Sequence, residues 1–412
     1  MLLILYFWIL LIENGTNWLW VLFNIGNGLE IRFSLILKVL FLILNFPLLL
    51  VTNQKRREIK FLFYFMFFLL ASTLYVGIIH PEYLTQAISV NFHIQLVLNI
   101  IIYIYWAKLK ETEIIKFYKW LRFFGLFNAI LVIISFIFPT LTSFFEARTS
   151  NEGITRAFGV MGDEVSLFLT FFFFDSLIFR QRIKTIIFSI ALFCTGSIGA
   201  FLTFLTLIGY YVFYVKKISK EYIIRLSVGS VFLFFGIFIF SGRIQELSVL
   251  KRIFINIQNP EMGTGNQRLI SLAAANNMIK ERPILGSGYG AYSSFVNQKY
   301  GYLTQGGNIS MNTLGSAYNP YVQMICEAGI IGLLLFILLL RRFIKACKRG
   351  TEPMNDFMTK FKTVSYGWLL IFFLTCLTAN WVLPTSFLFL LVVTLVGLNL
   401  KQNDLQYEQP ES

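Results

Sequence analysis

The chain has 412 residues, of which 57% are hydrophobic and 14% are charged, and its formal net charge is +14. A soluble domain carries roughly 25% charged residues, so the composition excludes an ordinary water-soluble protein and indicates a polytopic membrane protein. The positive charge does not imply nucleic acid, because basic cytoplasmic loops and attraction to anionic lipid explain it. Membrane lipids are therefore expected partners, and nucleic acid is not.

Apolar runs long enough to cross a bilayer recur along the chain, and a helix needs about 20 such residues for one crossing. We predict an all-α polytopic integral membrane protein with about twelve helices, one transmembrane domain over 1–400 and a polar cytoplasmic tail over 401–412. A break at 195–197 divides the longest run into two helices. The clear runs are 33–51, 60–79, 120–138, 164–180, 222–240, 320–340, 363–380 and 382–400, and the less regular ones are 1–12, 91–107 and 184–215.

Most of the 35 basic residues fall in alternate connections between these runs. Because basic loops favour the cytoplasm, this pattern places both termini inside and the long polar segment 241–317 outside. Within that segment, apolar side chains recur at helical spacing over 243–257 and again over 266–281, at Leu269, Leu272, Ala275 and Ile279. Pro283 should end the second helix. Two amphipathic helices there could lie on the bilayer surface or cover a cavity.

Outer arginines are the main chemical feature, because positive charge outside opposes the usual orientation bias. A planar guanidinium binds phosphate through two hydrogen bonds, so two or three could hold a pyrophosphate. The alternatives are contacts with lipid headgroups and pairing with nearby glutamates. These arginines are Arg148, Arg156, Arg243, Arg268 and Arg282.

Other candidate residues accompany them. Glu327 lies inside an apolar run, where an acid is costly unless it is paired or functional, and a structural ion pair with an arginine is the alternative. The glycine-rich stretch 286–290 predicts a sharp turn or a close backbone approach to a ligand rather than a nucleotide site. The four aspartates and two histidines are too scattered for a metal site, so we expect neither metal nor cofactor.

Three motifs follow one another in order. Asn266-Gln267-Arg268 precedes a predicted helix, Arg282-Pro283-Ile284-Leu285-Gly286-Ser287-Gly288 forms the turn, and Ser316-Ala317-Tyr318-Asn319-Pro320 leads into Glu327-Ala328-Gly329-Ile330-Ile331-Gly332. This order resembles the O-antigen polymerase and ligase superfamily of bacterial envelope glycosyltransferases, chiefly over 264–340. Arg156-Ala157-Phe158-Gly159 is similar to an arginine-containing segment of that family.

The resemblance implies a bacterial inner-membrane enzyme that transfers glycans from polyprenyl pyrophosphate without a metal. On this basis Arg268 and Arg156 would hold the pyrophosphate, with Arg243 and Arg282 in reserve, and Glu327 would be a base or an orienting partner. The turn at Gly286 and Gly288, together with Asn319, would contact substrate. The tyrosines would line the sugar path: Tyr289, Tyr292 and Tyr318.

The implied partners are lipid-linked oligosaccharide and, in the same pathway, a chain-length regulator and a flippase. Tyr318 stands where ligases of the family carry histidine, and Ser197-Ile198-Gly199 stands where many members carry Ser-Arg-Gly. The first departure favours a polymerase of O antigen or capsule, with an O-antigen ligase as the alternative. A flippase of the same lipid-linked glycan and a membrane scaffold are the non-enzymatic alternatives.

Overall fold

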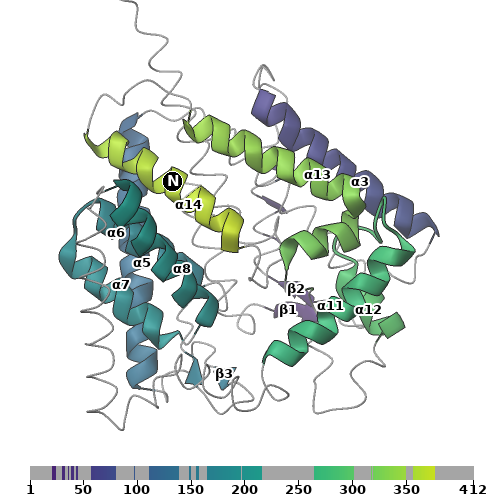
Figure 1. Cartoon of the computed structure of the whole chain (residues 1–412), viewed down its shortest axis with the longest axis horizontal. Coiled ribbons are helices and arrows are strands. Elements are labelled where there is room, and N and C mark those ends of the chain that lie inside the picture. Colours follow the sequence, from purple (N-terminus) through teal and green to yellow (C-terminus); the bar gives the residue numbers. More distant parts are fainter. Residues whose placement is uncertain are drawn as a thin grey trace, which may run out of the picture. The chain divides into compact units, whose positions relative to one another are not determined.

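The structure is a computed structural model, and helices dominate the part that it describes (Figure 1). The chain forms two compact units, and one boundary between them falls inside a helix, between Tyr118 and Lys119. Each unit is described by itself. Apart from a few isolated positions before residue 100, the described residues are 21–24, 30–32, 57–79, 111–138, 148–149, 155–156, 165–195, 197–215, 264–300, 317, 319–348 and 356–375.

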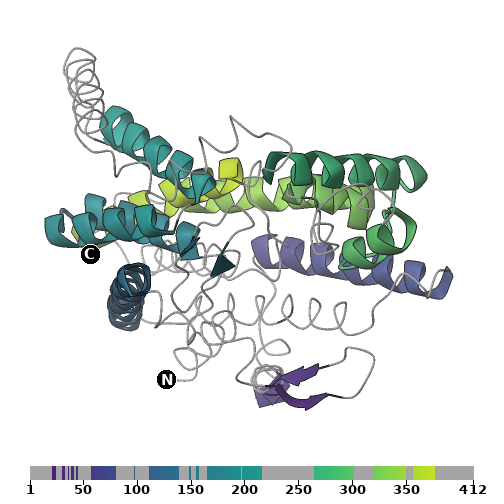
Figure 2. The same ribbon diagram turned by 90° about the horizontal axis from the view of Figure 1, so that it is seen from below.

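Unit 1 contains the segment that carries the family motifs. Figure 2 shows α11 along one side of α13 and α3 along the other, and short α12 follows the turn after α11. A two-stranded antiparallel ladder, which the sequence did not predict, belongs to the same unit. The elements are β1 (Val21–Asn24), β2 (Glu30–Arg32), α3 (Arg57–Ile79), α11 (Thr264–Glu281), α12 (Tyr292–Tyr300), α13 (Pro320–Lys348) and α14 (Asp356–Thr375).

Helix α13 is not straight, although its sequence predicts one continuous crossing. Gly329 has φ 67° and ψ −172°, which is far from helical geometry, and the ribbon changes direction there (Figure 1). The chain therefore forms a half-helix over 320–328 and a longer helix over 330–348. The predicted helix over 320–340 is confirmed, and the break at Gly329 inside it was not predicted.

Unit 2 is built on a core of phenylalanine side chains. Helix α6 is buried over its whole length except Leu177, and it packs against α7 and α8. Gly125 lets the ring of Phe172 approach α5, because a Cβ there would lie 2.6 Å from that ring. The elements are α5 (Glu111–Ile137, shared with unit 1), β3 (Arg148–Thr149), β4 (Thr155–Arg156), α6 (Val165–Ile178), α7 (Arg182–Cys194), α8 (Ile198–Tyr210) and the π-helix η4 (Tyr211–Val215).

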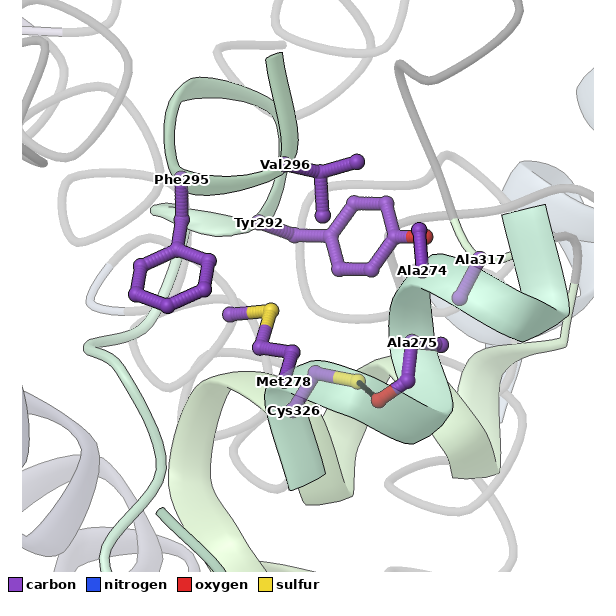
Figure 3. Packing of buried hydrophobic residues seen from close by; sticks show 8 residues of the cluster. All are labelled: Ala274, Ala275, Met278, Tyr292, Phe295, Val296, Ala317 and Cys326. Carbon is purple, nitrogen blue, oxygen red and sulfur yellow. Dashed lines mark hydrogen bonds between the residues drawn. The ribbon is translucent and has the colours of Figure 1, made fainter. Parts of the chain in front are cut away.

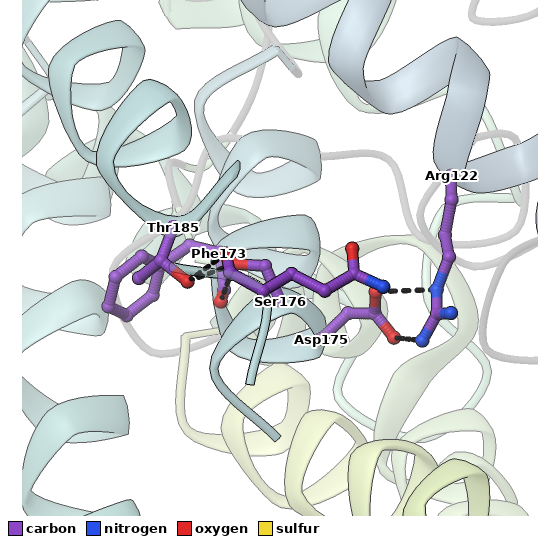
Figure 4. A network of polar contacts seen from close by, with 6 residues as sticks. Arg122, Phe173, Asp175, Ser176 and Thr185 are labelled. Carbon is purple, nitrogen blue, oxygen red and sulfur yellow. Dashed lines mark hydrogen bonds and ion pairs between the residues drawn. The ribbon is translucent and has the colours of Figure 1, made fainter. Parts of the chain in front are cut away.

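A buried ion pair joins α5 to α6 in unit 2 (Figure 4). The guanidinium of Arg122 donates two hydrogen bonds to the carboxylate of Asp175, each 2.8 Å long. The Arg122 guanidinium also lies over the ring of Phe179, 3.6 Å from its centroid. In the same network, the hydroxyls of Ser176 and Thr185 lie 2.9 Å apart and link α6 to α7.

Several predicted helices are confirmed. Helix α3 covers the predicted run 60–79, and the break at 195–197 separates α7 from α8 as expected. Within the described ranges, Ile115–Ile137 and Pro320–Arg342 are long and apolar enough to cross a membrane, and three shorter apolar helices accompany them. The total of about twelve crossings stays a prediction, since 1–12, 222–240, 382–400 and most of 33–51 and 91–107 lie outside the described residues.

Candidate functional site

The glycine-rich turn between α11 and α12 fills the break in α13. At the break, the carbonyl groups of Cys326 and Glu327 accept hydrogen bonds from the backbone N–H groups of Ser287 and Gly288, both 2.9 Å long. In return, the N–H of Ile330 donates to the carbonyl of Pro283 at 2.9 Å. Backbone groups released by the break are thus satisfied by the turn, as buried backbone N–H and carbonyl groups require.

Glycine makes this close approach possible. A Cβ on Gly286 would lie 2.4–2.5 Å from the backbone of Glu327 and Ala328, and a Cβ on Gly329 would lie 1.9 Å from the carbonyl oxygen of Ile284. Both glycines also have positive φ, and so has Gly288 at 96°. The predicted sharp turn and close backbone approach are confirmed, but the partner is the chain's own helix.

Helix α3 holds the other side of the turn. The hydroxyl of Ser72 donates to the carbonyl of Leu285 at 2.9 Å, and the N–H of Tyr289 donates to the hydroxyl of Thr73 at 2.9 Å. Sequence reasoning missed these two residues, because single hydroxyls in an apolar run carry no distinctive pattern. They fix the turn to a helix more than 200 residues earlier in the chain.

Glu327 lies at the end of the half-helix with 2% of its surface exposed. Its carboxylate accepts the N–H of Tyr292 at 3.3 Å and the side-chain amide of Gln323 at 3.1 Å, and it also accepts the backbone N–H of Gly290. These partners are neutral dipoles, not the arginine considered as an alternative from the sequence. Gln323 was missed, although a polar residue one turn before a buried acid is a usable indication.

Tyr292 connects this carboxylate to α11. Its ring is fully buried, and its hydroxyl donates to the carbonyl of Ser271 at 3.1 Å and lies 3.0 Å from the Ser271 hydroxyl. Figure 3 shows the ring between α12 and α11, with Cys326 reaching the Ala275 carbonyl across the cluster. The buried members of this cluster are Ala274, Ala275, Met278, Tyr292, Phe295, Val296, Ala317 and Cys326.

The two described arginines of 264–300 are exposed or half-buried. Helix α11 ends at Glu281, as Pro283 predicted, and Arg268 on its first turns is exposed. Arg282 is half-buried, and its guanidinium lies 5.9 Å from the centroid of the Phe295 ring. On the predicted apolar face of α11, Ala275 is buried and Ile279 is half-buried, whereas Leu269 and Leu272 are exposed.

Two residues predicted to contact substrate make structural contacts in this unit. The Asn319 side chain accepts the N–H groups of Tyr321 and Val322, at 2.9 and 3.2 Å, and so caps α13, with Pro320 in the first helical position. Tyr289 is 1% exposed. Burial, with the Glu327 carboxylate as the smaller cause, raises the pKa of Tyr289 well above its usual value, so its phenol stays protonated. Substrate contact by these side chains stays a prediction.

The remaining predicted residues are not part of this described cluster. Arg156 belongs to unit 2, where β3 and β4 pair in antiparallel register with Arg148 directly opposite Arg156. Arg243 and Tyr318 lie outside the described residues. The structure therefore brings together the turn, Glu327 and Tyr292 in unit 1, with Arg268 exposed on α11 of the same unit. The contribution of Arg156 stays a prediction.

Comparison with protein families agrees with the motif order. Residues 183–337, from α7 into the second part of α13, match the family model described as O-antigen ligase. This segment is similar to the O-antigen polymerase and ligase superfamily. The match confirms the resemblance and indicates glycan transfer of the polymerase or ligase type by a membrane protein. No curated protein shows significant similarity to the chain.

Proposed function

We propose that the protein is a polysaccharide polymerase acting on polyprenyl-pyrophosphate-linked repeat units of O antigen or capsule. The growing glycan would leave its polyprenyl pyrophosphate and join the terminal sugar of another lipid-linked unit. The observation that carries the proposal is the exposed Arg268 on α11, a helix fixed at its buried face to the interrupted α13. An exposed guanidinium on a rigid support suits the recognition of a pyrophosphate.

The reaction asks little covalent chemistry of the protein. The bond between the anomeric carbon and the pyrophosphate oxygen breaks, and its electron pair leaves with the pyrophosphate. The acceptor hydroxyl oxygen bonds to the same carbon and releases its proton. Negative charge grows on the leaving group, so guanidinium groups placed there lower the barrier.

The charge of the described residues 264–300 supports a role in pyrophosphate binding. Helices α11 and α12 and the turn between them contain Arg268, Lys280, Arg282 and Lys299 against Glu281 alone. Glu281 is paired with Lys299. The surface therefore keeps a net positive charge, which attracts a pyrophosphate.

The choice of polymerase over ligase rests on Tyr318. Family ligases carry histidine at this place, and a phenol with a pKa near 10 is a poor proton acceptor at neutral pH. The acceptor is therefore proposed to be another lipid-linked unit rather than lipid A-core. Arg156 in unit 2 is proposed as the second pyrophosphate ligand, with Arg243 and Arg282 in reserve.

Substitution of Arg268 tests the proposal. Arg268→Ala should lower polymer formation at least about a hundredfold, because removing a group that stabilises transition-state charge has effects of this size. Arg268→Lys should restore only part, since lysine keeps the charge but loses the two-pronged contact. Lys280→Ala, on the same helix and also exposed, is the matched control.

The assay uses purified lipid-linked repeat units with no lipid A-core acceptor and reads chain-length ladders on a gel. Thermal unfolding in detergent shows that each variant is folded. Normal ladders from Arg268→Ala would remove this residue from the site. Product that forms only after lipid A-core is added would overturn the polymerase assignment in favour of the ligase.

A further inference from the structure

Glu327 has an unusual set of partners for a buried acid. The carboxylate receives two backbone N–H groups, from Gly290 and Tyr292, and one side-chain amide, from Gln323. It therefore lies at the N-terminal end of α12, where helix N–H groups lack partners and favour a negative charge. A base that must take a proton from a sugar needs access to that sugar, and this side chain is 2% exposed.

A chain of hydrogen bonds leads from this carboxylate to α11, the helix that carries Arg268. The Glu327 carboxylate accepts the N–H of Tyr292, and the hydroxyl of Tyr292 donates to the Ser271 carbonyl on α11. Ser271 is buried, and the exposed Arg268 lies three residues before it, about one turn along the helix. These hydrogen bonds add to the packing of α11 against α13 and fix α11 to the start of α12.

We propose that Glu327 is a positioning residue that acts through Tyr292 and α11 to hold Arg268 toward the pyrophosphate. It does this as a hydrogen-bond acceptor, and its ability to take a proton is not used. The N–H of Tyr292 and the amide of Gln323 both donate to Oε1 of Glu327, and a glutamine at 327 keeps this acceptor oxygen. Loss of the acceptor frees the start of α12. The activity part of this inference rests on the proposed function.

The first measurement needs no substrate. Cys326 is 1% exposed and its thiol lies 3.6 Å from the Ala275 carbonyl on α11, so its reaction with a small maleimide reports whether α11 stays docked. In a variant whose other cysteines are replaced by serine, Glu327→Ala should raise the labelling rate several-fold, as local opening predicts. Glu327→Gln should leave the thiol protected.

The second measurement is polymer formation by the same variants. Glu327→Gln should stay within about fivefold of the wild type, whereas loss of a general base costs about a hundredfold to ten-thousandfold. Glu327→Ala should lose at least about tenfold. In a protein that already carries Arg268→Lys, Glu327→Ala should lower activity by a clearly smaller factor than in the wild type. The two changes act through the same guanidinium, so their effects should not add.

Each outcome decides the inference. A protected Cys326 in Glu327→Ala would overturn it, because α11 would then be held without the carboxylate. A protected Cys326 with equal activity losses in the glutamine and alanine variants would overturn it in favour of a base. If the wild-type protein forms no polymer, the proposed function fails, while labelling of Cys326 still decides whether Glu327 holds α11.

Discussion

Each unit of the molecule buries a carboxylate near a helix end, but the two are neutralised in different ways. In unit 2, Asp175 is 3% exposed and meets the full positive charge of Arg122 in a two-bond ion pair. In unit 1, Glu327 meets backbone and amide dipoles. The first arrangement joins two helices through opposite charges, and the second joins a turn, a helix start and a half-helix through directed hydrogen bonds.

This difference predicts what each region tolerates. An ion pair out of water depends on both charges, and removal of one leaves the other buried without compensation. Hydrogen bonds to a carboxylate depend on where its oxygens lie, so an amide of the same shape can replace much of the interaction. The stability of the turn in the α13 break should therefore depend on the size and shape of side chains there. The stability of the α5–α6 contact should depend on their charge.

Gly329→Ala is expected to have the largest effect, because it places a side chain where the glycine-rich turn contacts the break in α13. Its backbone conformation, φ 67° and ψ −172°, is nearly restricted to glycine and costs other residues about 1–3 kcal/mol. The new Cβ would also lie 1.9 Å from the carbonyl oxygen of Ile284, so the turn must move out of the break. We expect a large drop in the thermal unfolding temperature in detergent, with faster proteolysis of the segment 282–291.

Gly209→Ala is the matched control for that variant. Gly209 lies inside α8, and a Cβ there would meet nothing within 4 Å. Alanine favours a helix interior by up to about 1 kcal/mol, so this variant should be as stable as the wild type or slightly more stable. A Gly329→Ala protein that unfolds at the wild-type temperature would show that the turn does not occupy the break.

Asp175→Asn should have the next largest effect. The change keeps the size of the side chain but leaves the guanidinium of Arg122, which is 11% exposed, without its counter-charge. Breaking a buried pair in this way costs about 3–5 kcal/mol. The same carboxylate-to-amide change in Glu327→Gln should cost clearly less, and unfolding in denaturant measures both.

The double variant Arg122→Met with Asp175→Asn serves as the control for uncompensated charge. Because methionine removes the stranded guanidinium, it should recover part of the stability lost in Asp175→Asn. Equal losses in Asp175→Asn and Glu327→Gln would contradict the distinction between charge and shape drawn from the two regions.

Local sequence patterns predicted the helices of this protein better than their contacts. The end of α11 followed from Pro283, and the division between α7 and α8 followed from 195–197, because both are local breaks in an apolar or periodic pattern. Helix α12 and the ladders β1–β2 and β3–β4 were missed. Each is so short that its neighbours, rather than its own residues, stabilise it.

The break in α13 could not be predicted from its own sequence. Hydropathy continues through Gly329, and an isolated glycine in an apolar helix is common in membrane proteins. The break exists because a turn some 40 residues earlier supplies hydrogen bonds to Cys326 and Glu327. In the same way, the spacing of Leu269 and Leu272 gave the period of α11 but not the face that α13 covers, since that depends on a distant partner.

Tyr292→Phe should have a smaller effect than these changes, and it tests the hydrogen bonds within unit 1. The ring stays in the buried cluster, and only the hydrogen bonds between its hydroxyl and Ser271 are lost. A buried hydrogen bond of this kind contributes about 1 kcal/mol, so the unfolding temperature should fall slightly. Ser271→Ala keeps the Ser271 carbonyl that also accepts from Tyr292, and should cost less. If the side chains of Tyr292 and Ser271 act on α11 together, the double variant should lose less stability than the sum of the two single losses. Strictly additive losses would mean that the hydroxyl of Tyr292 does not hold α11 through the Ser271 side chain.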